Sequence, residues 1–165
     1  MAYAIRKAEW EDLPRIEQIY AQARSFMESH GNPNQWGKTN PPRVQLEQDI
    51  HNQLLYVLTD ESGIHGVFFF YIGPDPTYEI IEGAWHWDIP YGTIHRIASD
   101  GSGGILKAAV TYTHRMCRYI RIDTHRNNWV MQNALEKLSF LPCGIIYIAD
   151  GSPRIAYDRY LENWT

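Results

Sequence analysis

The chain has 165 residues, of which 44% are hydrophobic and 21% are charged, values typical of a soluble globular protein. Fifteen basic and nineteen acidic side chains give a formal charge of -4, which argues against a nucleic-acid partner and favours a neutral or cationic small one. No apolar run could span a membrane, and the two cysteines, Cys117 and Cys143, lack the spacing of metal ligands. We therefore expect a cytoplasmic protein with a single domain over residues 1–165 and no membrane partner.

The first half of the chain predicts two helices and a β-hairpin. Asp12 can cap a helix whose apolar residues recur at helical spacing from Leu13 to Met27. Residues 29–42 form a loop by their Gly, Asn and Pro content, and apolar runs on either side of the sequence TDESG predict the hairpin. The other expected elements are a strand at 3–7, a helix at 43–52, hairpin strands at 54–58 and 64–72, and an extended stretch at 78–87.

The second half alternates strands with helices around a glycine-rich loop. A strand at 91–98 leads into the sequence SDGSGG, and residues 105–117 that follow have helical spacing. Gly101, Gly103 and Gly104 allow positive φ and remove side chains that would obstruct a ligand. The N–H groups at the helix start then suit a phosphate, although a tight turn without a ligand fits these residues equally. The remaining expected elements are a strand at 119–124, a helix at 129–138, and strands at 143–148 and 154–160.

Together these elements predict a mixed α/β fold of three layers, with a parallel strand pair around the loop's helix and antiparallel hairpins on both sides. A dinucleotide-binding fold is one alternative, because Asp123 lies 20 residues after Gly103 at a strand end. Two observations oppose it. The third glycine of its fingerprint falls on Leu106, and the loop comes too late in the chain for the parallel strands that such a fold needs.

The order of strands and helices, with a glycine loop after the central strand, resembles the GNAT acetyltransferase superfamily. The resemblance covers residues 3–160 and is clearest in the segments HRIASDGSGGILKAAVTYTH, IRIDTHRNNWVMQNALEKLSF and CGIIYIADGSPRIAYDRY. It implies a mostly antiparallel central sheet with a splayed parallel strand pair and helices on both faces. It also implies acetyl-CoA as the co-substrate.

The resemblance further implies where acetyl-CoA binds. In the superfamily the loop's N–H groups hold the pyrophosphate, the preceding strand contacts the pantetheine arm, and the next strand splays away. Asn128 matches the first residue of the family motif N-x-x-A-x-x-L-Y-E-K-x-G-F. The implied cofactor-binding residues are Ile97, Ala98, Ser99, Asp100, Gly101, Ser102, Gly103, Gly104, Ile105 and Asn128.

Departures from the family pattern bear on the chemistry. Ala98 stands where most members have Arg or Gln, so that side-chain contact to the cofactor is absent. Leu135 stands where the motif has a Tyr, often the general acid toward the leaving thiolate, and Ser139 replaces the motif's Gly. Tyr91, Tyr157 or solvent would have to supply the proton instead. These departures leave open a second class of function, a sensor domain that binds CoA or a small amine without turnover.

Attack on the thioester requires a neutral amine, and therefore a base. The tract IIEGAWHWDIPYGTIHR offers Glu82, His86, Asp88 and His95, and strand alternation would place the first three on one face. We expect Glu82 to be the base, because acids in this region often serve so in the superfamily, with His125 second. The alternative is that His95 and Arg96 are hydrogen-bonded polar groups of a strand and that His86 is a solvated loop residue.

We expect Trp36, Trp85 and Trp87 to form the acceptor wall, because aromatic faces attract ammonium groups; Trp36 as a packing residue is the alternative. The sequences HWD and DTH lack a third ligand, so we predict no metal. The expected function is acetyl-CoA-dependent N-acetylation of a primary amine on a small molecule, without a nucleic-acid partner. A homodimer is left open.

Overall fold

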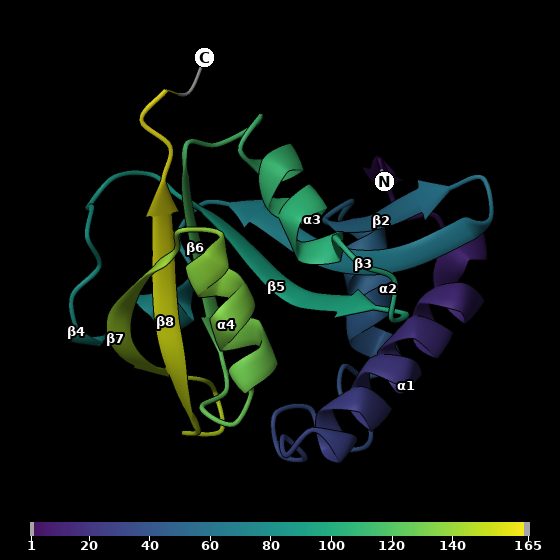
Figure 1. Ribbon diagram of the computed structural model, residues 1–165, viewed down its shortest axis with the longest axis horizontal. Coiled ribbons are helices and arrows are strands. Elements are labelled where there is room, and N and C mark those ends of the chain that lie inside the picture. The colour runs from purple at the N-terminus through teal and green to yellow at the C-terminus, as the bar shows by residue number, and fades with distance from the viewer. Residues whose placement is uncertain (1, 164–165) are drawn as a thin grey trace.

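Eight strands form one mixed sheet in the computed structural model, which describes residues 2–163 of the chain (Figure 1). Their order is β1-β2-β3-β5-β6-β8-β7-β4. The strands are β1 (Ala4–Lys7), β2 (Leu55–Asp60), β3 (Gly63–Ile72), β4 (Glu82–Gly83), β5 (Gly92–Ser99), β6 (Tyr119–Thr124), β7 (Leu141–Tyr147) and β8 (Pro153–Tyr160). The helices are α1 (Leu13–Ser29), α2 (Arg43–His51), α3 (Ile105–Thr113) and α4 (Trp129–Lys137), with short 3-10 turns at Trp10–Asp12 and Pro76–Tyr78. No helix within the described residues has the length and apolar character needed to cross a membrane.

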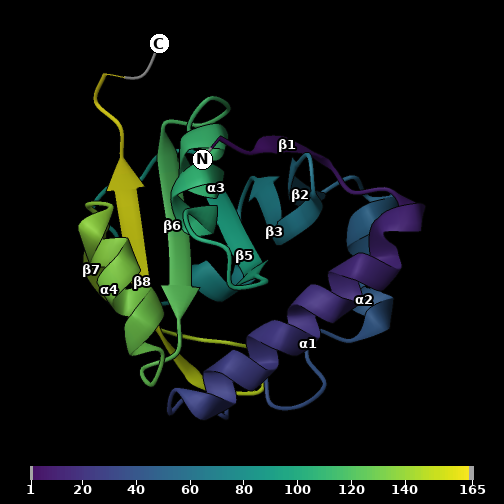
Figure 2. The ribbon, with the colours of Figure 1, turned by 45° about the vertical axis from the view of Figure 1, so that its right-hand side comes forward.

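Helices cover both faces of the sheet, which gives three layers (Figure 2). The alternation of side chains along β3 explains this arrangement. Val67 and Phe69 pack with the residues of α1 and α2, whereas Phe68 and Phe70 pack with those of α3 on the other face. Each such side chain that is fully buried stabilises the fold by roughly 1.5–3 kcal/mol.

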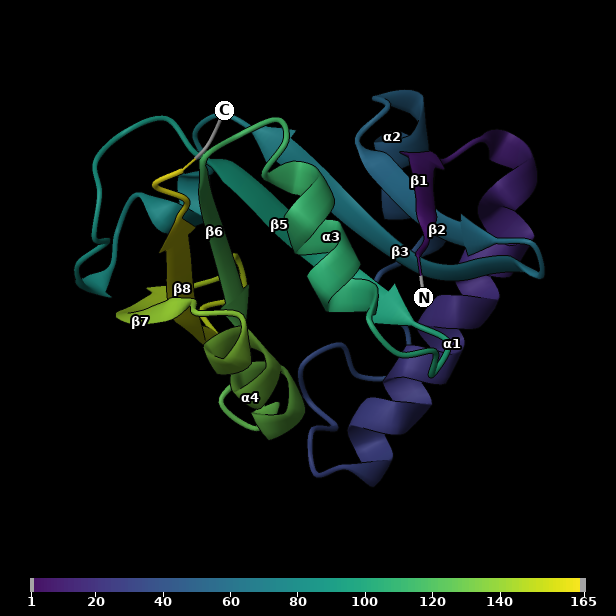
Figure 3. The ribbon, with the colours of Figure 1, turned by 45° about the horizontal axis from the view of Figure 1, so that its top comes forward.

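The parallel strands β5 and β6 separate after two residue pairs, so the sheet splays open between them (Figure 3). They pair at Gly92–Ile120 and Thr93–Arg121, while β6 pairs along its whole length with β8 on its other side. Glycine at position 92 makes room for the ring of Phe70 on β3, because a Cβ there would lie 2.5 Å from that ring. The opening therefore faces the carboxyl ends of β5 and β6.

A β-bulge interrupts β5 where it faces this opening. The register between β3 and β5 shifts between Val67 and Phe69, so that Arg96 and Ile97 together oppose the single residue Phe68. Arg96 has a φ of +52°, a conformation that few residues with side chains adopt. Such a bulge takes one residue's backbone groups out of the ladder.

Two helices hold the bulge in this conformation. The hydroxyl of Tyr20 on α1 donates a 2.6 Å hydrogen bond to the Arg96 carbonyl oxygen. Burial raises the pKa of Tyr20, which keeps the hydroxyl protonated as a donor. The Arg96 guanidinium donates hydrogen bonds of 3.0 and 2.8 Å to Asp49 on α2 and lies 4.4 Å from the centre of the Phe69 ring.

The predicted fold class is confirmed: the sheet is mostly antiparallel, contains one splayed parallel pair and has helices on both faces. Most predicted elements are present with ends displaced by a few residues. The largest difference is at the helix after the glycine loop, which ends at Thr113 instead of residue 117.

The prediction of an extended stretch at residues 78–87 is wrong. Within it only Glu82–Gly83 pairs, with β7. The chain turns at Gly83, which has a φ of +122°, and the Trp85 indole nitrogen then donates a 3.0 Å hydrogen bond back to the Tyr78 carbonyl. Because this segment is a loop around aromatic side chains, the expected face that would carry Glu82, His86 and Asp88 does not form.

Candidate functional site

The glycine loop joins β5 to α3 and forms the first part of the candidate site. Gly101 and Gly104 have φ values of +99° and +80°, so these positions require glycine. Gly103 was expected to share this conformation and does not, but a Cβ there would meet no atom within 4 Å. Its lack of a side chain therefore keeps the approach to the loop open. α3 begins directly after Gly104, and the first N–H groups of a helix lack intrahelical partners.

Side chains of the loop bind two of its own N–H groups. Ser99 Oγ accepts a 3.0 Å hydrogen bond from the Gly101 N–H, and Asp100 Oδ1 accepts one of 3.0 Å from the Ser102 N–H. The N–H groups of residues 103–106, at the start of α3, are therefore the better placed donors for a phosphate.

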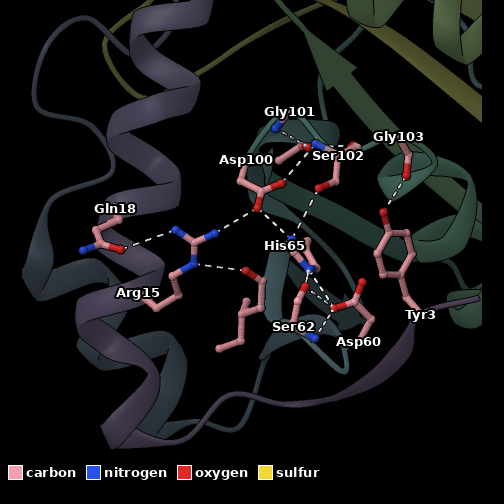
Figure 4. A network of polar contacts seen from close by, with 12 residues as sticks. Tyr3, Arg15, Gln18, Asp60, Ser62, His65, Asp100, Gly101, Ser102 and Gly103 are labelled. Atoms are coloured by element: carbon pink, nitrogen blue, oxygen red, sulfur yellow. Dashed lines mark hydrogen bonds and ion pairs between the residues drawn. The ribbon is translucent and has the colours of Figure 1, made fainter. Parts of the chain in front are cut away.

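A charged network ties Asp100 of this loop to the β2–β3 hairpin and to α1 (Figure 4). His65 lies between two carboxylates, with Nδ1 2.8 Å from Asp100 Oδ2 and Nε2 2.8 Å from Asp60 Oδ1. These hydrogen bonds, that of Asp100 foremost, raise the pKa of His65. The Arg15 guanidinium also donates to Asp100, at 2.9 Å. The charge of this carboxylate is thus compensated beside the phosphate donors.

A cavity of about 410 Å³ begins at the glycine loop and extends into the space between α1 and α4. Among the predicted cofactor-binding residues, those that line it are Ile97, Ala98, Ser99, Asp100, Gly101 and Asn128. Asn128 is the N-cap of α4: its Oδ1 accepts from the Met131 N–H at 3.0 Å, and its Nδ2 donates to Gln35 Oε1 at 2.9 Å. We call this space the cofactor cavity.

A second cavity of about 780 Å³ adjoins the first, and we call it the acceptor cavity. The two share the lining residues Met27, Ile97, Asn128 and Met131. Its remaining walls come from the loop between α1 and α2, the segment after β3, the bulge of β5, the end of β6 and the turn between β7 and β8. Trp36 lies in this wall, with its ring edge-on to Tyr20 at 5.5 Å.

A histidine between two aspartates lines the acceptor cavity. His95 Nε2 is 2.7 Å from Asp75 Oδ2, and His95 Nδ1 is 3.7 Å from Asp123 Oδ1. Burial alone would raise the pKa of Asp75, but hydrogen bonds from His95 and Thr77 outweigh it and bring the pKa to about 2. The buried Tyr78 hydroxyl donates a 2.5 Å hydrogen bond to Asp123. Asp75 is therefore a carboxylate near neutral pH, and it orients the imidazole.

The two residues predicted as bases lie outside both cavities. Glu82 is exposed at the sheet edge, where it accepts a 2.8 Å hydrogen bond from the Tyr147 hydroxyl. His125 follows β6 next to the acceptor cavity, and its Nδ1 accepts a 3.0 Å hydrogen bond from the Asn127 N–H. Burial, followed by the charge of Arg154, lowers the pKa of His125.

Trp85 and Trp87, expected beside Trp36, are likewise absent from the residues that line the acceptor cavity. The Arg121 guanidinium lies 4.2 Å from the centre of the Trp85 ring, and Trp87 stacks on Tyr160 at 5.0 Å. Both indoles therefore pack against neighbouring side chains, and only Trp36 of the three reaches the cavity.

Sequence reasoning missed three charged residues of the acceptor cavity, Asp75, Asp150 and Arg154. Asp75 begins an Asp-Pro-Thr turn in which its carboxylate accepts from the Thr77 N–H at 2.9 Å. That turn is recognisable in sequence, but its proximity to His95 is not. The two alternative acids also lack an evident role, since the Tyr91 hydroxyl accepts from the Asp75 N–H at 2.7 Å and Tyr157 is buried.

One group within residues 2–163 offers three potential metal ligands, His86, Cys143 and Asp158, whose ligand atoms all lie within 4.8 Å of one another. His86 Nδ1 is 2.7 Å from Asp158 Oδ1 and 3.4 Å from Cys143 Sγ. Burial and the Asp158 charge raise the pKa of the Cys143 thiol, which favours the protonated, non-ligating form. None of the three lines either cavity.

No protein-family model and no curated protein matches the chain. Among solved structures, a GNAT-family acetyltransferase from Streptococcus agalactiae is 28% identical with a TM-score of 0.87, over 98% of this chain and 96% of that one. A GNAT-family acetyltransferase from Listeria monocytogenes is 15% identical with a TM-score of 0.69, over 96% and 95%. A ribosomal-protein-alanine N-acetyltransferase from Brucella melitensis is 16% identical with a TM-score of 0.62, over 96% and 99%.

The splayed parallel strands, the glycine loop and these similarities define the fold of the GNAT acetyltransferases. The similarity to the Streptococcus agalactiae protein supports membership of the GNAT superfamily, with no subfamily assigned.

Proposed function

We propose that the protein is an acetyl-CoA-dependent N-acetyltransferase that acetylates a primary amine of a small molecule. The observation that carries this proposal is the junction of the two cavities. Ile97 lines both of them, and it lies in the bulge of β5, where β5 and β6 have separated. A thioester that reached this junction from the glycine loop would meet an amine bound in the acceptor cavity.

The bulge offers a group that can polarise the thioester carbonyl. Since Arg96 and Ile97 together oppose one residue of β3, a backbone group there is free of the ladder. A backbone N–H fixed by its surroundings stabilises the charge that develops on a carbonyl oxygen during acyl transfer. We propose that the N–H groups of this bulge do so, held by Tyr20 and Asp49.

His95 is the proposed base. With its Nε2 proton donated to Asp75, the imidazole has Nδ1 left as a proton acceptor. Asp123, 3.7 Å from Nδ1, attracts the ammonium form of the acceptor to this position. Transfer of one proton to Nδ1 frees the nitrogen lone pair that attacks the acetyl carbon. As the C–N bond forms, the nitrogen loses its second ammonium proton to solvent. The thiolate leaves with the electrons of the C–S bond and takes a proton from solvent, because the buried Leu135 has no proton to give.

The dimensions and lining of the acceptor cavity support a small acceptor. A volume of about 780 Å³ lies within the range of small-molecule sites. The indole of Trp36 and the carboxylates of Asp75, Asp123 and Asp150 all line it. Aromatic faces and carboxylates both attract an ammonium group, each weakly on its own.

Release of free thiol from acetyl-CoA, measured with a panel of primary amines, tests this proposal. His95→Gln should lower kcat/KM by about 10²–10⁴-fold, as expected for loss of a general base, and should keep the stabilisation of the protein by acetyl-CoA. Glu82→Gln is the matched control and should leave both unchanged. If acetyl-CoA stabilises the protein but no amine releases thiol, the protein is a CoA-binding sensor and not a transferase.

A further inference from the structure

Arg154, on β8, is a buried cation in the wall of the acceptor cavity. It is only 6% exposed, and it lines the cavity together with Gln35 and Asp150. Burying a charged group without a compensating partner is costly, so its surroundings are informative.

The guanidinium has no carboxylate partner within the described chain. None of the ion pairs within 4.0 Å among residues 2–163 involves Arg154. Its hydrogen bonds go to two carbonyl oxygens, from Nη1 to Pro153 at 2.9 Å and from Nη2 to Gln35 at 3.3 Å. A guanidinium has five N–H groups, so donors remain after these two bonds.

Thr124, on the neighbouring strand β6, provides a second unused polar group. Thr124 is 1% exposed and lines the acceptor cavity. Its Oγ1 has no hydrogen-bond partner among residues 2–163. The register pairs Thr124 with Ile155 and Asp123 with Ala156, so by strand alternation Arg154 shares a sheet face with Asp123, and Thr124 lines the cavity from the other face.

The wall of the acceptor cavity carries both positive and negative charges. Burial lowers the pKa of Arg154, and the nearby charges of Asp123 and Asp150 oppose that effect, so the guanidinium stays protonated. Asp123 also lies beside His95. A ligand that carries both an ammonium and a carboxylate group would therefore find groups of opposite charge for each in this cavity, Asp75 and Asp123 beside His95 and the guanidinium of Arg154.

We infer that the acceptor is a zwitterion, a free amino acid or a similar small molecule, whose carboxylate binds Arg154 and whose amine lies between Asp123 and His95. This inference rests on the proposed function and names its substrate class. A planar guanidinium binds a carboxylate through two parallel hydrogen bonds, and these are stronger than bonds between neutral groups. The carboxylate supplies the partner that Arg154 lacks within the chain.

Pairs of acceptors that differ only in the carboxylate test the inference in the unaltered protein. Each pair consists of an α-amino acid and its carboxamide, compared by kcat/KM for thiol release from acetyl-CoA. We expect the amino acid to exceed the carboxamide by at least about tenfold, the ratio that one charge-assisted hydrogen bond provides. Equal values for the two members would overturn the inference while leaving N-acetyltransferase activity in place. Absence of thiol release from every amine would overturn both.

An arginine variant separates substrate binding from a structural role. Arg154→Met should remove the preference for the carboxylate by raising the KM for amino acids, with the KM for acetyl-CoA unchanged. Arg159→Met, on the same strand and outside both cavities, is the control and should keep the preference. If Arg154 only tethers the loop through Gln35, the variant will lower Tm and affect amino acids and carboxamides equally, and the inference fails.

Discussion

Replacement of Asp75 by asparagine keeps the His95 imidazole in the acceptor cavity but removes the carboxylate that orients it. In the protein, the Asp75 carboxylate accepts a 2.7 Å hydrogen bond from His95 Nε2 through Oδ2 and two bonds from Thr77 through Oδ1, of 2.9 and 2.6 Å. Asparagine preserves the size of the side chain and can still accept the Thr77 bonds. It removes the negative charge that fixes the imidazole proton on Nε2.

The size of the effect follows from the burial of the pair. A hydrogen bond to a charged group contributes roughly 1.5–3 kcal/mol, which corresponds to about tenfold or more in rate. The side chains of His95 and Asp75 are 23% and 16% exposed, which places the pair at the lower end of that range. We expect kcat/KM for the amine to fall about tenfold, with the KM for acetyl-CoA unchanged.

The charge of Asp75 is constant over the pH range of such an assay. Its pKa is about 2, so the carboxylate is charged from about pH 5 to about pH 9, and Asp75→Asn removes the same charge throughout that range. The lowered pKa of Asp75 also means that its contribution to stability is complete above its ordinary value of 3.8 and is lost as pH falls through about 2.

Asp150→Asn is the matched control. Asp150 also lines the acceptor cavity and also accepts a hydrogen bond from a turn N–H, that of Ser152 at 2.8 Å, but it has no contact with His95. Asp150→Asn should lower kcat/KM for the amine by much less than Asp75→Asn does, because it leaves the hydrogen bond that orients His95 in place. An unchanged kcat/KM in Asp75→Asn, or an equal loss in both variants, would refute the role of Asp75 in orienting a basic imidazole.

Three further predictions concern the bulge and the loop. Tyr20→Phe removes the donor to the Arg96 carbonyl and should destabilise the protein by about 1–3 kcal/mol in denaturant unfolding; an unchanged midpoint would contradict it. The raised pKa of His65 stabilises the fold below its ordinary value of 6.5 and ceases to do so as pH rises through the raised value. The loss of Tm in His65→Gln should therefore be larger at pH 5.5 than at pH 9, and an equal loss would disprove the ionic tether. Gly101→Val should abolish the Tm increase given by acetyl-CoA, whereas Gly151→Val, with a similar positive φ outside the loop, should retain it.

The order of the elements was predictable because each leaves a local signal. Apolar periodicity marks the helices, and the glycines between residues 99 and 105 mark the turn from β5 to α3. The loop at residues 78–87 was not predictable, because its aromatic and β-branched residues suit a strand as well as a packed loop. The hydrogen bond from Trp85 to the Tyr78 carbonyl, which holds this segment as a loop, leaves no pattern in the sequence.

The candidate base shows why the site was harder to predict than the fold. His95 was among the candidates, but Glu82 was preferred on the pattern of the superfamily. The choice depends on Asp75, which is 20 residues from His95 in sequence and becomes its neighbour through the β3–β5 pairing. The bulge at Arg96 further alters which side chains of β5 face the cavity, and strand alternation alone does not predict a bulge.

A crystal structure of the protein with bound acetyl-CoA tests the central claim most directly. We expect the pyrophosphate against the N–H groups of residues 103–106 and the pantetheine arm in the cofactor cavity. We expect the acetyl group at the junction of the two cavities, beside Ile97 and within reach of an amine bound at His95. Acetyl-CoA bound elsewhere, or with its thioester directed away from the acceptor cavity, would contradict it.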